Sequence, residues 1–411
     1  MSPTAAEQEF RLNLEDRPPD NVVALVINHA AALKVSDLFF CSNAEEVTIS
    51  ARHLGIQRYV ASLPPDLGRH CIAHLKALAG MDVVEKRRPG DGRWMLRRPG
   101  SSPLDLRIST VPTLYGEDMT IRLLDRDAQL LSLEKLGLPR RDYNQLLALL
   151  HNPSGLLLVA GPTGSGKTTT LYACLSYLNN GERKIHTIED PIEYTIDGIR
   201  QSQINPRIDV GFAELLRSVL RQAPDIIMIG EIRDPETADI AVRAANSGHL
   251  VLSTVHAPVA AGVIPSILNL GVHPHFLANC LLGAMAQRLV RTLCPQCKLV
   301  FDISDSPHSF DEVKHLLEPG QGDRLYGPKG CPQCRMLGFG GRTGIFEMLT
   351  VTPAIRQLIV ERQPMQVIRQ KACEEGLVEF RQSAMVKVAR GETCVEEVFR
   401  TIPSEYLSDS R

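Results

Sequence analysis

The sequence lacks any apolar run that approaches the roughly 18–20 residues a transmembrane helix needs. Its first residues, MSPTAAEQEFRLNLEDRPPD, also lack the basic start and apolar stretch of a secretory signal peptide. Both absences favour a cytoplasmic protein, in which cysteine thiols stay reduced.

An excess of charge of one sign is missing as well, since 45 basic residues are balanced by 47 acidic ones. Aromatic residues make up only 5% of the chain and are not interleaved with basic ones. Together these features argue against direct binding of nucleic acid. The content of 44% apolar and 22% charged residues is that of a folded globular protein.

The order of predicted elements indicates several domains in the 411 residues. Short strand-like runs such as VTISA and LDLRIST come first, and buried-type strands (GLLLVAG, KIHTIED, DIIMIGE, HLVLSTV) alternating with helices come later. The second pattern is typical of an α/β domain with a mostly parallel sheet. We therefore predict a flexible tail at 1–20, a small α+β domain at 21–127, a linker and helix at 128–150, the α/β domain at 151–290, a tetracysteine subdomain at 291–350 and a helical C-terminal region at 351–411.

GPTGSGKT at 161–168 matches the phosphate-binding pattern G-x-x-x-x-G-K-[ST]. A predicted strand precedes it and a predicted helix follows it, so the amides at the start of that helix would point at an anion. Lys167 can reach the β- and γ-phosphates, and the Thr168 hydroxyl suits Mg²⁺. The predicted nucleotide site comprises Gly161, Pro162, Thr163, Gly164, Ser165, Gly166, Lys167, Thr168 and Thr169.

Two segments could supply carboxylates to this site. TIEDPIEY ends a strand with Glu189, Asp190 and Glu193, and LRQAPDIIMIGEIRD runs a buried strand into Glu231. Most such side chains are solvated loop charges. Carboxylates at the carboxyl ends of strands in a phosphate-binding sheet lie where ligands bind, so we expect functional roles.

Cys294, Cys297, Cys331 and Cys334 form two C-x₂-C pairs separated by 33 residues, and the segment between them must loop out. Four thiolates suit a closed, structural, tetrahedral zinc site. Reduced thiols without metal and a redox pair remain alternatives. Duplication of the pair favours zinc.

Several stretches resemble motifs of the type II secretion and type IV pilus assembly ATPases. The resemblance lies in LRQAPDIIMIGEIRD, TIEDPIEY, SGHLVLSTVHA at 247–257, RISTVPTLYGEDMTIRLLDR at 107–126 and GCPQCRMLGFGGRTGIFEML at 330–349, and it extends from about residue 21 to residue 403.

The resemblance implies a RecA-like P-loop domain preceded by a small α+β (PAS-like) domain. It implies that Glu193 orients or deprotonates the attacking water, with Glu189 as the competing carboxylate, and that Glu231 holds Mg²⁺ through water. His256 would sense the γ-phosphate, and Arg107 and Arg122 would reach the phosphates from the N-terminal domain. Arg221 and Arg233 are weaker candidates.

The resemblance also implies a homo-hexameric ring with ATP, Mg²⁺ and Zn²⁺ as cofactors. This ring would be peripheral at the cytoplasmic face of the inner membrane and would act on a platform protein to assemble a pilus or pseudopilus. A retraction motor is an alternative, although the cysteine pairs favour assembly. A nucleotide-bound regulatory scaffold is another alternative. It is suggested by Ala257-Pro258, which follow His256, and by the length of only about 20 residues before the first domain.

Overall fold

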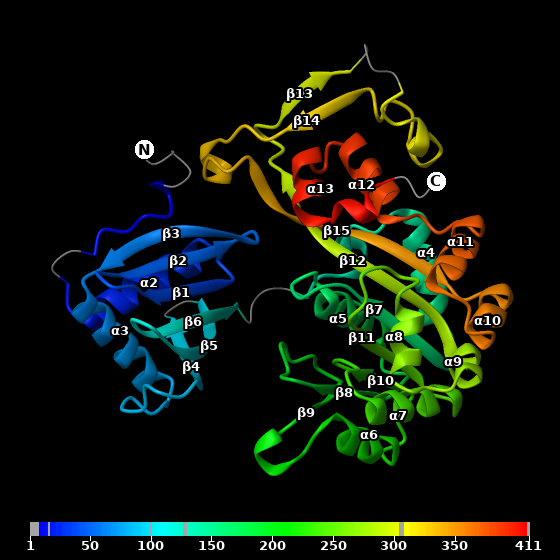
Figure 1. The fold of residues 1–411 in the computed structure, drawn as a ribbon, viewed down its shortest axis with the longest axis horizontal. Helices are drawn as coiled ribbons and strands as arrows, with labels where there is room; N and C mark the ends of the chain where they lie inside the picture. The colour runs from blue at the N-terminus through cyan, green and yellow to red at the C-terminus, as the bar shows by residue number, and fades with distance from the viewer. Residues whose placement is uncertain (1–7, 15–16, 99–100, 126–129, 304–307, 409–411) are drawn as a thin grey trace. The chain divides into compact units, whose positions relative to one another are not determined.

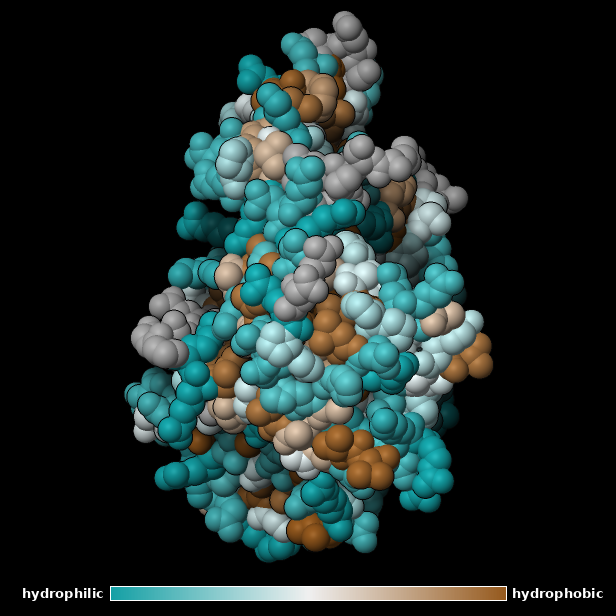
Figure 2. All heavy atoms as spheres, turned by 90° about the vertical axis from the view of Figure 1, so that its left-hand side faces the viewer, coloured by the Kyte–Doolittle hydropathy of each residue, from teal (hydrophilic) through white to brown (hydrophobic). Residues whose placement is uncertain are grey.

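The structure is a computed structural model that describes residues 8–14, 17–98, 101–125, 130–303 and 308–408. It divides into two compact units, of which the first comprises residues 1–129 and 329–339 and the second comprises residues 130–328 and 340–411. In the described parts of the chain, no helix is both long and apolar enough to cross a bilayer. Hydrophobic side chains on the face shown in Figure 2 lie in small groups among hydrophilic ones.

In its described residues the first unit contains a six-stranded antiparallel sheet together with the helices α2 and α3 (Figure 1). The strand order is β3-β2-β1-β6-β5-β4. The elements are α2 (Pro19–Ala32), β1 (Asp37–Ser42), β2 (Val47–His53), β3 (Ile56–Leu63), α3 (Pro65–Leu78), β4 (Gly90–Arg98), β5 (Ser101–Thr113) and β6 (Gly116–Asp125). Leu106 and Ile108 of β5 are buried in the same core as residues of α2 and α3, so the intervening Arg107 belongs to the other face of the sheet.

The core of the first unit includes residues from the stretch expected to be a tail. Phe10 is fully buried and Leu14 is 4% exposed, and α2 already begins at Pro19. Burial of two large apolar side chains ties this part of the chain to the sheet, which a count of polar residues at 1–20 does not reveal. Residues 1–7 and 15–16 of that stretch lie outside the described residues.

The second unit is built on a seven-stranded sheet of order β15-β12-β7-β11-β10-β8-β9. Its strands are β7 (Gly155–Ala160), β8 (Ile185–Glu189), β9 (Arg200–Gln203), β10 (Ile226–Ile229), β11 (Leu250–Val255), β12 (Leu281–Leu293) and β15 (Phe339–Thr350). The six from β12 to β9 are parallel, and they include all four strands expected from GLLLVAG, KIHTIED, DIIMIGE and HLVLSTV. An α/β fold with a mostly parallel sheet is thus confirmed.

Helices cover both faces of this sheet (Figure 1). Leu157 and Val159 of β7 pack in one core with η1 (Leu133–Leu136), α4 (Arg140–Leu150) and α5 (Lys167–Leu178). Leu156 and Leu158 pack in the other core with the remaining helices, because side chains alternate between the faces of a strand. Those helices are α6 (Phe212–Leu220), α7 (Pro235–Asn246), α8 (Val263–Asn269), α9 (Pro274–Cys280), α10 (Pro353–Val360), α11 (Met365–Glu374), α12 (Phe380–Ala389) and α13 (Val395–Thr401).

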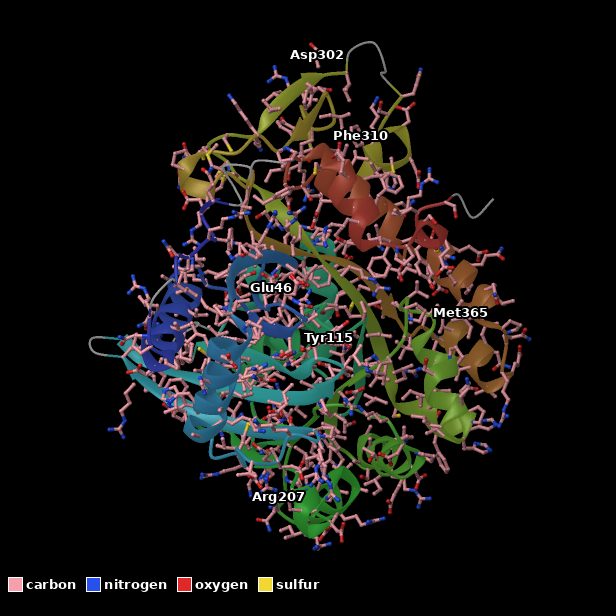
Figure 3. The ribbon with its side chains drawn as sticks, turned by 60° about the vertical axis from the view of Figure 1, so that its left-hand side comes forward. Glu46, Tyr115, Arg207, Asp302, Phe310 and Met365 are labelled. Atoms are coloured by element: carbon pink, nitrogen blue, oxygen red, sulfur yellow. The ribbon has the colours of Figure 1, made fainter. Side chains whose placement is uncertain are left out.

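The expected looping segment between the cysteine pairs is a two-stranded ribbon of β13 (Leu299–Asp302) and β14 (Arg324–Gly327), joined through η3 (Asp311–Leu316). Figure 3 labels Asp302, which ends β13, and Phe310, which lines a pocket with Ala384 of α12. The ribbon is inserted between β12 and β15, which are neighbours in the main sheet. β15 was expected within the tetracysteine subdomain, and the structure places it in that sheet instead.

Candidate functional site

The loop at 161–166 connects β7 to α5, as the phosphate-binding motif requires. Gly161 and Gly166 have φ of 145° and 89°, a region that favours glycine. Lys167, the first residue of α5, donates from Nζ to Gly161 O at 2.8 Å and Pro162 O at 3.1 Å. Burial lowers the pKa of Lys167, Glu231 opposes this effect, and Arg288 and Arg233 add to it.

Gln287 of β12, which none of the sequence motifs indicates, holds the phosphate-binding loop through two hydrogen bonds. Its Nε2 donates to Ser165 O at 2.7 Å, and its Oε1 accepts from Thr170 Oγ1 at 2.8 Å. A Cβ on Gly161 would lie 2.5 Å from Gln287 O, so the loop requires glycine there. The signal in the sequence is Gln287-Arg288, a polar pair inside a stretch that otherwise reads as a buried strand.

Glu231 and His256 follow the neighbouring parallel strands β10 and β11. His256 Nε2 lies 2.7 Å from Glu231 Oε1, and Arg233 Nη2 lies 2.6 Å from Glu231 Oε2. The Glu231 side chain is 15% exposed, whereas those of His256 and Arg233 are 56% and 66% exposed. The fold therefore brings together two residues predicted from separate motifs.

The carboxylates after β8 are in different environments. Glu189, the last residue of the strand, is 3% exposed and accepts from Tyr172 Oη, from Thr187 Oγ1 at 2.5 Å and from Gln201 Nε2 at 3.0 Å. Asp190 is exposed and Glu193 is half-buried. The three donors to Glu189 already use much of its capacity to accept hydrogen bonds.

Arg107 and Arg122 of the first unit are directly paired across β5 and β6. Arg93 pairs with Arg107 on the other side, so three arginines form a row across the sheet. Asp37 accepts a hydrogen bond from Arg122 Nε at 3.2 Å, and Arg93 donates hydrogen bonds to the Asp105 carboxylate. Like charges directly opposite one another destabilise a sheet, and Asp37 and Asp105 offset part of this repulsion.

The four cysteines form a cluster in which every sulfur lies within 4.8 Å of the others. The Sγ atoms of Cys331 and Cys334 are 3.7 Å apart, which fits the ~3.8 Å edge of a tetrahedron with Zn–S bonds of about 2.3 Å. Cys334 Sγ also accepts from the amides of Cys331 and Gly338, both at 3.2 Å, which favours a thiolate. The donor set fits zinc.

Cys294 and Cys297 provide the other pair of this cluster. A tight turn places them, with the amides of Cys297 and Lys298 donating to Cys294 O at 3.3 and 3.1 Å. None of these four described cysteines forms a disulfide bond.

A further arginine candidate, Arg221, lies at the end of α6 and makes a hydrogen bond within that helix. It caps α6, and its Nη2 donates to Ser218 Oγ at 3.2 Å. Arg233, by contrast, contacts Glu231 directly.

Known proteins are similar to this chain over nearly its whole length. It is 42% identical over 387 residues to "Type II secretion system ATPase E" of Vibrio cholerae, covering 94% of this chain and 76% of that protein. It is 39% identical over 382 residues to "Type IV pilus assembly ATPase TfpB" of Acinetobacter baylyi, covering 93% and 65%. The structure of the pilus retraction motor PilT with bound ADP is 25% identical, with a TM-score of 0.62 and coverage of 95% and 97%.

The match to PilT shows that the fold is that of an α/β ATPase. The profile of the family described as "Type II/IV secretion system protein" matches residues 13–400, which include the phosphate-binding loop, the acidic motifs and the cysteine pairs. The chain belongs to the type II/IV secretion system protein family.

Proposed function

We propose that this protein is a motor ATPase that hydrolyses ATP to drive assembly of a pilus or pseudopilus. The observation that carries the proposal is the convergence of Lys167, Glu231 and His256, whose motifs lie far apart in the sequence, at the carboxyl ends of neighbouring parallel strands. Nucleotides bind at that edge of such sheets. Two of its relatives are named as secretion and pilus assembly ATPases.

The residues present fit Mg-ATP. The start of α5 and the Lys167 ammonium offer positive charge to the phosphates, and Gly164 leaves open space where a side chain would otherwise stand. We assign the phosphates to residues 161–169, and Mg²⁺ to the exposed Thr168 hydroxyl and, through water, to Glu231. Bound Mg²⁺ would neutralise charge on the phosphoryl oxygens.

In the proposed reaction Glu193 orients the attacking water and accepts its proton, and His256 contacts the γ-phosphate. Arg107 and Arg122 add positive charge from the first unit. Phosphoryl transfer depends mainly on positioning and on neutralising charge. Charges supplied by a second unit make hydrolysis depend on closure of that unit, and this dependence would couple chemistry to movement.

We further propose that the first unit corresponds to the PAS-like domain and that Cys294, Cys297, Cys331 and Cys334 hold a structural zinc ion. The working form would be a homo-hexamer at the cytoplasmic face of the inner membrane, which acts on a platform protein and binds no nucleic acid. The balanced charge of 45 basic and 47 acidic residues supports the last point.

The decisive experiment measures ATP hydrolysis by the purified assembly and by Lys167→Ala and Glu193→Ala. We expect a loss of at least about 10²-fold in each, because each change removes a contact made to the reacting phosphoryl group or water. Glu214→Ala on the exposed side of α6 is the matched control and should retain full activity. Equal and negligible rates in the wild type and both variants would instead support the nucleotide-bound scaffold.

The retraction motor is the second candidate, because the fold also matches PilT. Deleting the gene separates the two directions of movement. Loss of surface pili or of secretion supports assembly, whereas an excess of pili that no longer retract supports the alternative.

A further inference from the structure

Tyr172 lies on α5, one turn after Thr168, and its side chain is 1% exposed. Residues four apart lie on the same side of a helix, so the same side of α5 carries the predicted magnesium ligand and this phenol. The ring packs edge-on against that of Tyr194, with centroids 5.9 Å apart. Tyr172 therefore extends from the phosphate-binding helix to the loop that follows β8.

The Tyr172 hydroxyl makes three hydrogen bonds. It donates to Glu189 Oε2, and it accepts from the backbone N–H of Glu193 at 3.2 Å and from that of Tyr194 at 3.4 Å. A phenol has one proton to donate and two lone pairs with which to accept, so its full capacity is used. Burial, together with the bond to Glu189 and its charge, raises the pKa of Tyr172, so the phenol keeps the proton that it donates.

The other partners of Glu189 extend this arrangement into β9. Gln201 Nε2 donates both to Glu189 Oε1 at 3.0 Å and to Tyr194 O at 2.9 Å. The amide of Ile196 donates to Gln201 Oε1 at 2.9 Å. The backbone on both sides of Tyr194 is thus held by buried or half-buried side chains rather than by solvent.

We propose that Tyr172 is a positioning residue for hydrolysis, which fixes the backbone of Glu193 relative to the phosphate-binding helix. In this arrangement Glu189 orients the phenol and does not act as the base. This inference rests on the proposed function, and specifically on Glu193 as the residue that acts on the attacking water. A displacement of about 1 Å at such a group can cost on the order of 10²-fold in rate.

The test is Tyr172→Phe, which keeps the buried ring and removes only the hydroxyl. We expect kcat to fall about 10- to 100-fold while the KM for ATP changes less than about 3-fold, because the phosphate-binding loop is unaltered. Tyr177→Phe on the same helix is the matched control, since its hydroxyl bonds His151 Nε2 at the surface. It should behave as the wild type.

A double-mutant cycle with Glu193→Gln separates positioning from a general loss of structure. Single-turnover rates are measured with enzyme in excess, so that slow variants stay measurable. If Tyr172 acts through Glu193, then Tyr172→Phe causes less than about 2-fold further loss in the Glu193→Gln background. An equal loss in both backgrounds overturns the proposal, as does a wild-type rate for Tyr172→Phe or a KM that rises as much as kcat falls.

Glu189→Gln is the second variant, and it is decisive if Tyr172→Phe does not fold. The new glutamine side chain places an N–H₂ group opposite one of the groups that donate to Glu189, either the Tyr172 hydroxyl or Thr187 and Gln201. The loop is therefore held less firmly, but the fold of the site is kept. We expect the same fall in kcat and the same absence of further loss in Glu193→Gln. A loss that equals or exceeds that of Glu193→Gln would identify Glu189 as the base and overturn the inference. A wild-type rate for Glu193→Gln itself would instead refute the role of Glu193 in the proposed function.

Discussion

His256 Nε2 lies 2.7 Å from Glu231 Oε1, although the two residues belong to different motifs. The contact arises because β10 and β11 are parallel neighbours whose carboxyl ends meet at one edge of the sheet. Glu231 is also close enough to Lys167 to affect its pKa. The Glu231 carboxylate therefore interacts with both Lys167 of the phosphate-binding loop and the imidazole of His256.

Replacing His256 tests whether this pair serves hydrolysis. In His256→Ala we expect kcat to fall by on the order of 10²-fold, because one polar contact to the transferred group is lost. The dissociation constant for a fluorescent ATP analogue should change little, since Lys167 and the loop amides remain. His275→Ala, at an exposed histidine of α9, is the control. Unchanged kcat, or binding lost in proportion to kcat, would contradict the prediction.

Replacing Gln287 tests how the phosphate-binding loop is preorganised. Gln287→Ala leaves Ser165 O and the Thr170 hydroxyl without their buried partner, which costs about 1–3 kcal/mol. We expect a KM for ATP raised about 10-fold and a lower melting temperature. The difference in melting temperature from the wild type should widen at saturating nucleotide, because the variant binds the nucleotide more weakly and gains less stability from it. Gln366→Ala at an exposed position of α11 should show neither effect. Normal affinity for ATP in Gln287→Ala would mean that the loop holds its shape without this clamp.

The nucleotide-binding half of the fold could be predicted from the sequence because its physical signals are local. Buried parallel strands appear as continuous apolar runs, and the phosphate-binding loop is a contiguous pattern of glycines before Lys167. The edges of the units could not be predicted. Burial of Phe10 depends on a sheet formed by residues distant in the sequence. β15 pairs with β12 in the main sheet, although the ribbon between the cysteine pairs separates the two strands in the sequence.

The same limit applies within the site. Glu189 and Glu193 have similar local sequence contexts, and only the fold shows that Glu189 is buried against Tyr172, Thr187 and Gln201. Tyr172 itself reads as an ordinary apolar position of a helix, because the partners of its hydroxyl come from another segment. Polar contacts made across elements leave no periodic signal in the sequence.

The buried carboxyl of Glu347 makes stability depend on pH. It accepts from the amides of Ala260 at 2.9 Å and Phe380 at 3.0 Å, which links the loop after His256 to the start of α12. Burial raises the pKa of Glu347 from 4.5 to about 7. The folded state thus binds a proton that the unfolded state releases, so the stability from this group is complete below pH 4.5 and is lost as the pH rises to about 7.

Glu347→Gln removes this dependence. Between about pH 5 and pH 7 the unfolding free energy of the variant should rise relative to that of the wild type, by up to ~1.4 kcal/mol per pH unit. Above about pH 8 the difference should be constant. Denaturant titrations at several pH values measure it, with Glu214→Gln as the control. A difference that does not vary with pH would show that Glu347 stays ionised in the folded protein.

The cysteine cluster predicts one tightly bound zinc ion per chain. Elemental analysis of freshly purified protein should find it, and Cys331→Ser should lose it, because a three-thiolate site is weaker and open. Cys41→Ser, at a half-buried cysteine outside the cluster, should keep its zinc. Metal binding requires the thiolates, so chelators should release zinc faster below neutral pH and should lower the melting temperature of the wild type but not of Cys331→Ser. Freshly purified protein without zinc, and with four thiols that react freely, would contradict the site despite the 3.7 Å separation of the Cys331 and Cys334 sulfurs.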